Sequence, residues 1–270
     1  MSNFINSVNS IGLLDDMARQ KSYIHRLHPL TKLSATLAYL IIVVSFNRYE
    51  VIGLFPLSLY PIILLTLADI PAKFILKRLL FIEPFIIGIG ILNPLLDHHI
   101  INVAGFTLSR GWVTFISIFI KSGLTITAAI LLVATTGMDK LAYALRTLKI
   151  PRLFVLQLML TYRYISVLME ELSQILTAYS LRAPNQKGVS HKAWGSLVGQ
   201  LILRTFDRAY RVYEAMRLRG FTGEYNNGNG ASFKINDLIY LTICVLFFVI
   251  ARTPLTVFIT HNSSLSLLRF

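Results

Sequence analysis

Cysteine and charged residues are both scarce in this sequence. Cys244 is the single cysteine among 270 residues and stands in an apolar run, which excludes a disulfide framework and a thiolate metal cluster. Only 14% of the residues are charged, whereas 54% are hydrophobic. With a mean hydropathy of +0.62, the chain has too many apolar residues for one soluble core. The composition therefore predicts a membrane protein that crosses the bilayer several times.

The signatures of several function classes are also missing. No Gly-rich phosphate loop followed by Lys and Ser or Thr occurs, so ATP hydrolysis would have to come from a partner. No HExxH, paired-aspartate or Ser-His-Asp signature marks a membrane enzyme that acts on lipid. Clear internal repeats, which are typical of an autonomous transporter, are absent as well. We expect no catalytic site and no cofactor, and these two classes remain the rivals of the interpretation below.

The charge that is present is mostly positive, with a formal net charge of +13 at pH 7. A chain this basic could bind nucleic acid. In a membrane protein, however, cation-rich cytoplasmic loops beside anionic lipid explain the excess more simply. We therefore expect these cations to meet the lipid bilayer and not nucleic acid. Residues 1–12 lack the cationic head and apolar stretch of a signal peptide, so we expect no cleaved leader.

Five apolar runs are candidates for membrane spans, and several approach the ~20 residues needed to cross hydrocarbon. The third contains Glu83-Pro84 and Asn93-Pro94, which predict a broken helix packed against protein. The sequence thus predicts an all-α polytopic membrane protein with about five spans. The runs cover residues 33–46, 51–68, 79–96, 112–136 and 238–250.

The distribution of cations predicts the orientation of these spans. Lysines and arginines cluster before the first run and between the second and third, whereas the turn at 47–50 holds only Arg48. The positive-inside rule then places the N-terminus in the cytoplasm and the loop at 97–111, with a short hairpin around 103–107, outside. The block from 138 to 225 returns to the cytoplasm. We accordingly divide the chain into residues 1–137, 138–225 and 226–270.

The cytoplasmic block is predicted to consist of three helices. A short helix over 138–149 ends before Pro151, and two helices over 152–181 and 192–219 each extend roughly 45 Å at the rise of an α-helix. The block carries 13 Lys and Arg against 6 Asp and Glu. Three arginines of the second long helix share a basic face, for which a hydrated surface or a lipid-headgroup contact is the alternative to a docking role. These are Arg204, Arg208 and Arg211.

Both long helices end on an arginine that precedes a small residue. Arg182 stands before Ala183-Pro184, and Arg219 stands before Gly220, which is expected to stop the helix. The planar guanidinium group of arginine can form bidentate hydrogen bonds to a carboxylate or to backbone oxygens without losing its charge. A rigid arginine at a helix tip therefore indicates a docking device. The alternative is a solvated last turn whose cations complement the helix dipole.

These residues carry a resemblance to a known family. The arginine tips, Thr161-Tyr162-Arg163-Tyr164-Ile165 and the segment from Arg208 to Phe221 resemble the transmembrane coupling (T) component of energy-coupling factor transporters. The resemblance covers nearly the whole chain. Residues 16–32, with His25 and His28-Pro29, and Ala134-Thr135-Thr136 are similar to the cobalt-type branch.

The resemblance implies which residues dock. In that family a paired Ala-Arg-Gly-like motif inserts its arginines into grooves on two ATPase subunits, and here those positions are Arg182 and Arg219. The first motif departs from the pattern, with Leu181 and Ala183 where Ala and Gly are common. The expected coupling residues are Arg182, Arg219, Leu181, Ala183, Leu218 and Gly220, supported by Arg204, Arg208 and Arg211.

The resemblance also implies a mechanical function in the cell membrane of a prokaryote. ATP binding would close two ATP-binding cassette subunits, and the coupling helices would carry that motion to a separate membrane substrate-binding (S) subunit of the cobalt type. The chain itself would bind neither ATP nor metal. Cobalt is the expected substrate, with nickel or a vitamin as alternatives, and a membrane-embedded lipid-modifying enzyme is the alternative from a different class.

Histidines and intramembrane polar residues are the remaining chemical candidates. His98 with His99, and His25 with His28, could gather a transition metal, but neither pair supplies the convergent ligands of a structured site, and hydrated polar caps explain them better. Glu83 and Lys121 lie in or near predicted spans and are functional candidates for that reason. The simpler interpretations are that Glu83 fixes the helix break and that Lys121 snorkels or meets a partner subunit.

Overall fold

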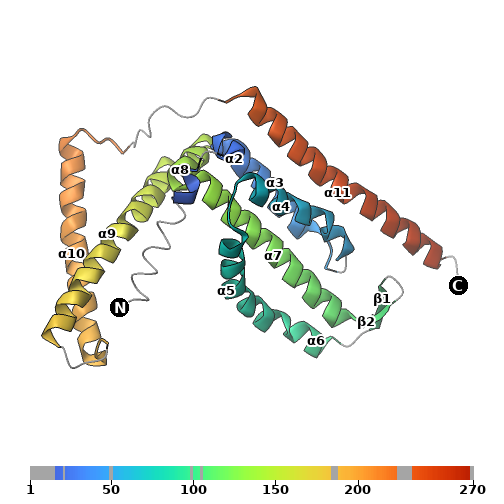
Figure 1. Ribbon diagram of the computed structural model, residues 1–270, viewed down its shortest axis with the longest axis horizontal. Coiled ribbons are helices and arrows are strands. Elements are labelled where there is room, and N and C mark those ends of the chain that lie inside the picture. Colours follow the sequence, from blue (N-terminus) through green and yellow to red (C-terminus); the bar gives the residue numbers. More distant parts are fainter. Residues whose placement is uncertain are drawn as a thin grey trace. The chain divides into compact units, whose positions relative to one another are not determined.

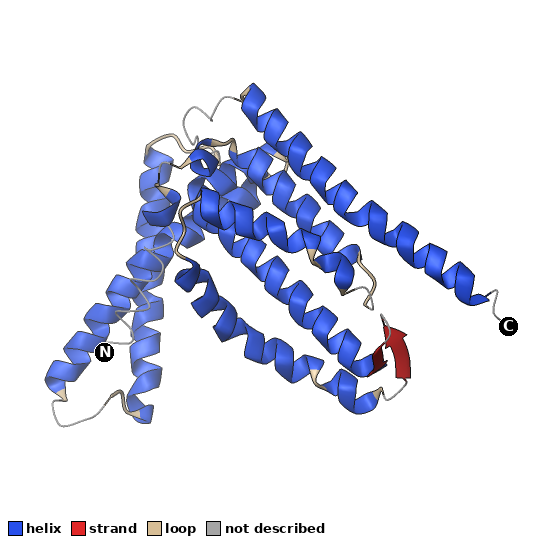
Figure 2. Ribbon diagram, turned by 45° about the vertical axis from the view of Figure 1, so that its right-hand side comes forward, coloured by secondary structure: helices blue, strands red, loops and turns tan. Residues whose placement is uncertain are grey.

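The computed structural model describes residues 16–20, 22–48, 51–97, 100–103, 106–183, 188–223 and 233–267. This part of the chain is helical apart from one short hairpin, which confirms the predicted all-α class (Figures 1 and 2). The contacts divide it into two compact units. Of the described residues, one unit holds those within 16–137 and 233–267, and the other holds those within 138–223.

The first unit begins with one short helix and a longer helix started by proline. Helix α2 spans Tyr23–Arg26 and α3 spans Pro29–Ser45. Pro29 fits the first helical position because its fixed φ suits the helix and its missing N–H would have no partner there. The His28 side chain caps the same end, where its Nδ1 accepts a hydrogen bond from the Leu30 N–H at 3.2 Å. The 3-10 turns η1 (Ile52–Leu54) and η2 (Pro56–Ser58) lead into α4 (Leu59–Leu67).

The third predicted span is broken, but not where its first proline stands. Helix α5 (Ala72–Gly90) continues through Pro84, and the break falls at Ile91, before α6 (Leu92–Leu96). The expectation that Glu83 fixes the break is therefore wrong. The predicted hairpin is confirmed, with β1 (Ile100–Val103) antiparallel to β2 (Phe106–Ser109). Ile100 pairs with Ser109 and Val103 with Phe106, and this hairpin contains the strands of the described chain.

Helix α7 (Arg110–Thr136) is the central element of this unit. It packs against α3, α4, α5 and α6, and Figure 1 shows α3 and α5 on opposite sides of it. The last helix, α11 (Ile235–Leu267), packs against α3. Aromatic rings of three elements meet in the core, where the Tyr39 ring centroid lies 4.6 Å from that of Tyr60 and 5.4 Å from that of Phe248. Hydrophobic burial between apolar helices thus holds the first unit together.

Two buried polar contacts tie the ends of these helices together. The Lys32 ammonium donates to the Thr135 carbonyl at 2.8 Å and so joins α3 to α7. The Asp237 carboxylate, in the first turn of α11, accepts from the backbone N–H groups of His28 and Lys234, each at 2.8 Å. Buried polar groups need such partners, because an unpaired one costs ~1–3 kcal/mol.

Four helical segments of the described chain are long and apolar enough to cross a membrane: Ala72–Leu96, Arg110–Thr136, Arg152–Arg182 and Ile235–Arg252. Three of them correspond to predicted spans. The two N-terminal runs form shorter apolar helices, at Pro29–Ser45 and Pro56–Leu67, and the continuous span expected over 51–68 is instead divided by 3-10 turns. Arg152–Arg182, predicted as a coupling helix, is apolar enough to qualify because its first half is apolar nearly all round.

Candidate functional site

The second unit consists of three helices, of which two are long. Helix α8 spans Met138–Thr147, α9 spans Arg152–Arg182 and α10 spans His191–Leu218. The 31 residues of α9 and the 28 of α10 correspond to about 46 and 42 Å at the rise of an α-helix. The two predicted coupling helices are therefore present, within one residue of their expected boundaries. Neither contains an internal proline, so each is a continuous rod.

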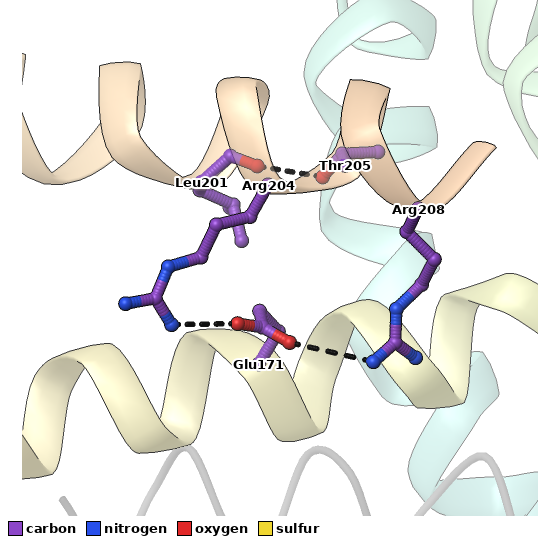
Figure 3. A network of polar contacts seen from close by, with 5 residues as sticks. All are labelled: Glu171, Leu201, Arg204, Thr205 and Arg208. Atoms are coloured by element: carbon purple, nitrogen blue, oxygen red, sulfur yellow. Dashed lines mark hydrogen bonds and ion pairs between the residues drawn. The ribbon is translucent and has the colours of Figure 1, made fainter. Parts of the chain in front are cut away.

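A single carboxylate joins the two long helices (Figure 3). Glu171 of α9 accepts a hydrogen bond from Arg204 Nη1 of α10 at 2.7 Å, and its other oxygen lies 3.7 Å from Arg208 Nη2. Arg204 and Arg208 are one helical turn apart, so one acidic group meets both. Their side chains are 47% and 44% exposed, and each such pair contributes at most ~1 kcal/mol. The main consequence is that the pairs fix which face of α10 meets α9.

This network corrects one detail of the predicted basic face. Arg204 and Arg208 contact the neighbouring helix, whereas Arg211, the third member, is exposed. The two arginines therefore have a partner inside the chain before any other protein arrives. The sequence offered no signal for Glu171, because the rotation that brings α9 and α10 together depends on packing along both helices.

The tip of α10 is shaped by a left-handed glycine. Gly220 has a φ of +78°, and its N–H donates to the Arg217 carbonyl at 3.0 Å. The Phe221 N–H donates to the Met216 carbonyl, also at 3.0 Å. These two bonds form a Schellman motif, which satisfies the last carbonyls of the helix and ends it sharply. Arg219 is the exposed C-cap residue, held next to the turn.

The tip of α9 has the same kind of sequence but a different ending. Arg182 is the last helical residue and is exposed, and Ala183 caps the helix with an ordinary negative φ of −128°. Its N–H continues the helical pattern to the Tyr179 carbonyl at 3.1 Å. The Tyr179 hydroxyl in turn accepts from the Ser190 N–H at 3.3 Å, just before α10 begins. Ala183, which replaces the usual glycine, is therefore compatible with its backbone conformation.

The flanking residues of both tips are accessible. Leu181 is 77% exposed and Leu218 is 90% exposed, which is unusual for leucine. A further exposed apolar stripe winds along α10, and its consecutive members are three or four residues apart and therefore neighbours on the helix surface. It is formed by Trp194, Val198, Ile202, Phe206, Tyr210 and Tyr213, each at least 44% exposed.

The histidine candidates lie in the first unit or outside the described chain. His25 and His28 are buried, and Ser22 Oγ lies 2.8 Å from His25 Nδ1. They are therefore packed groups and not the hydrated caps we expected. His98 and His99 lie outside the described residues. Within the described part, no three His, Cys, Asp or Glu side chains gather as a metal site would require.

Lys121 has a role that the sequence did not reveal. Its ammonium donates to the backbone carbonyl of Phe46 at 2.6 Å and lies 3.4 Å from that of Asn47. These carbonyls follow the last turn of α3, where four backbone acceptors lack partners within the helix. A lysine on α7 thus caps the C-terminal end of α3. The expected snorkelling or contact with a partner subunit is replaced by this contact within the chain.

Comparison with known proteins identifies the class to which this architecture belongs. Residues 20–229 match the family model described as CbiQ, Cobalt transport protein. The chain therefore belongs to this family, the membrane T components of energy-coupling factor transporters, and the predicted family is confirmed.

Individual relatives are similar to much of the chain. The chain is 30% identical over 221 residues to the energy-coupling factor transporter transmembrane protein EcfT of Bacillus subtilis, an alignment that covers 75% of this chain and 82% of that protein. It is 27% identical over 250 residues to EcfT of Ruminiclostridium cellulolyticum, covering 84% and 90%. It is also 26% identical over 149 residues to the nickel permease LarQ of Lactiplantibacillus plantarum, covering 54% and 55%.

Proposed function

We propose that this chain is the coupling subunit of an ATP-driven uptake transporter in the cell membrane of a prokaryote. It passes the motion of two ATPase subunits to a membrane subunit that binds the substrate. The observation that carries the proposal is the pair of exposed arginines, Arg182 and Arg219, at the ends of two long helices. The Glu171 network supports the same function, because levers that transmit force need a fixed mutual register.

Each tip is suited to one ATPase subunit. An arginine in a groove can form two parallel hydrogen bonds to a carboxylate or bond several backbone carbonyls, and it stays charged throughout. The exposed Leu181 and Leu218 beside the arginines supply apolar contact at the same place. Two such tips on two separate helices fit two copies of one partner better than a single groove would.

The exposed apolar stripe of α10 supports a further partner. Contiguous apolar surface of this kind marks an interaction site with protein or membrane. In the proposed function, the stripe is covered by lipid or by the membrane subunit that binds substrate. Either contact would transmit tilting of α10 into the membrane plane.

We propose cobalt as the transported ion. The description of the matching family model supports cobalt. Nickel is the alternative, because one relative is named a nickel permease. Uptake of radiolabelled Co²⁺ and Ni²⁺ by cells that contain the complete transporter decides between them. Uptake of neither ion would contradict the metal assignment and favour a different small substrate, such as a vitamin.

The docking role is tested by reversing the charge of the tips. The double variant Arg182→Glu/Arg219→Glu is expected to lose the ATPase subunits in co-purification, whereas single Arg→Ala variants weaken the complex. Lys73→Glu/Lys77→Glu is the matched control, since both positions are exposed, belong to the first unit and undergo the same change of charge. Undiminished ATPase recovery with the double tip variant would overturn the proposal.

A further inference from the structure

One carboxyl group in the first unit has no hydrogen-bond partner among the described residues. Glu83 of α5 is only 6% exposed, and neither of its side-chain oxygens forms a hydrogen bond with the described chain. A buried polar group without a partner is costly, and ionisable residues within membrane spans usually serve a function. The position of Glu83 on a continuous stretch of helix shows that it does not serve to end α5.

Glu83 lies deep in its span. It is the twelfth residue of the 25-residue segment Ala72–Leu96, about 17 Å along the helix from its start. Gly123, which faces it from α7, is the middle residue of the 27-residue segment Arg110–Thr136. With a hydrocarbon core of ~30 Å, the middle of each such span is expected to lie within the hydrocarbon layer.

A cavity opens beside this carboxyl group. It has a volume of about 300 Å³ and is formed by η2, α4, α5 and α7. Its walls are almost entirely apolar, and Glu83 is its one acidic residue; Ile62, Leu79, Phe119, Gly123 and Leu124 are among the others. We call it the Glu83 pocket. Because Gly123 has no side chain, the carboxyl lies against its backbone, and a Cβ there would be 3.4 Å from Glu83 Oε1.

The chemistry of the Glu83 pocket restricts what can occupy it. Acyl chains would fill its walls but bring no hydrogen-bond donor, and headgroup amines stay at the membrane surface. Within the hydrocarbon layer, such a donor is best supplied by a side chain carried on a membrane-spanning helix. The volume lies at the lower end of the range for ligand pockets, ~300–1,000 Å³, so it suits one large side chain and not a whole helix.

We propose that the Glu83 pocket receives a hydrogen-bond-donating side chain from a membrane-spanning helix of the partner subunit that binds substrate. The proposal rests on the proposed function for the existence of that partner. The Glu83 carboxyl turns toward the opening when the donor enters, a rotation that is permitted because its terminal torsion is broad. The donor satisfies the carboxyl, and the surrounding apolar walls exclude competing groups.

The first test compares four variants in the complex reconstituted from the chain, its ATPase subunits and the membrane partner. Glu83→Leu removes the acceptor, and we expect its affinity for the membrane partner to fall roughly tenfold, because the donor is then buried without a hydrogen-bond partner. Glu83→Gln keeps an acceptor oxygen and should retain most of the affinity. Gly123→Leu, which fills the pocket, should lose the partner as Glu83→Leu does, while Gly88→Leu is its matched control because nothing lies within 4 Å of that position.

The thermal stability of the chain alone separates docking from folding. Glu83 has no partner within the described chain, so Glu83→Leu should leave the melting temperature unchanged or raise it. ATPase recovery should be unchanged in all four variants, which keeps this result independent of the arginine tips. Full retention of the membrane partner by Glu83→Leu and Gly123→Leu would overturn the proposal and leave the proposed function intact.

The second test labels the carboxyl group directly. N,N′-dicyclohexylcarbodiimide adds a protonated carboxyl across one of its C=N bonds, and its apolar rings direct it to sites inside the membrane. We expect it to modify Glu83 in the isolated chain in lipid nanodiscs and to be blocked when the membrane partner is bound. Equal labelling with and without the partner, or protection in the chain alone, would contradict the proposal.

Discussion

Single residues at the ends of helices decide how the proposed levers are built. Gly220 ends α10 because its φ of +78° is available to glycine at no cost, whereas a residue with a Cβ is strained there. Gly195, inside the same helix, has ordinary helical geometry and no atom within 4 Å of where a Cβ would be. The same substitution at the two positions is therefore expected to have opposite effects.

We predict that Gly220→Ala destabilises the second unit by ~1 kcal/mol and that Gly195→Ala stabilises it by ~0.5–1 kcal/mol. The first variant should also weaken recovery of the ATPase subunits, since Arg219 lies next to the altered turn. Thermal melting of the purified proteins and co-purification measure the two effects. Two shifts of the same sign would show that the backbone conformation of Gly220 does not shape the tip.

We also predict that the contact of Lys121 with the end of α3 stabilises the chain. In Lys121→Met the carbonyls at the end of α3 lose their donor while the aliphatic packing is kept, which should cost ~1–3 kcal/mol. The melting temperature should fall by roughly 2–4 °C for each kcal/mol. Lys73→Met is the control, because Lys73 is exposed in the first turn of α5. Equal melting of both variants would show that the contact with Phe46 does not stabilise the chain.

At the scale of elements, helix boundaries set by local sequence signals could be predicted, whereas contacts between residues far apart in the sequence could not. The ends of α9 and α10 follow from Pro151 and Gly220, whose backbone effects are legible in the sequence, so both helices were placed within a residue. The partners of Glu171 and Lys121 depend on how helices pack, so no local signal points to them. In the run at 51–68, by contrast, Pro56 begins the second 3-10 turn and was a local signal against one continuous span. The arginine tips of the candidate site could be predicted from the sequence. The ion pairs of Glu171 that fix how α9 and α10 meet could not.

Continuity of α9 is the property on which force transmission depends. Ile175 lies in this helix and is only 4% exposed. Ile175→Pro removes a helical hydrogen bond and kinks the helix at a cost of ~3 kcal/mol or more, whereas Ile175→Ala leaves the backbone straight and loses only packing. We expect the proline variant to lose substrate uptake while ATPase activity in reconstituted complexes survives better. A proportional fall of substrate uptake and ATPase activity in the proline variant would contradict the proposal that α9 transmits force. The same pattern of loss in the alanine variant would contradict it as well.

Orientation belongs to the whole molecule, and the cation distribution predicts it. We expect His191, the first residue of α10, to lie in the cytoplasm and Arg48, in the exposed turn after α3, to lie outside. Each position is changed separately to cysteine in a Cys244→Ala background, which removes the single native thiol. A membrane-impermeant maleimide should then label Arg48→Cys in intact cells and His191→Cys only after permeabilisation, while the Cys244→Ala parent stays unlabelled. Labelling of His191→Cys in intact cells would invert the orientation, and the arginine tips would then be unable to reach ATPase subunits, which act in the cytoplasm where ATP is present.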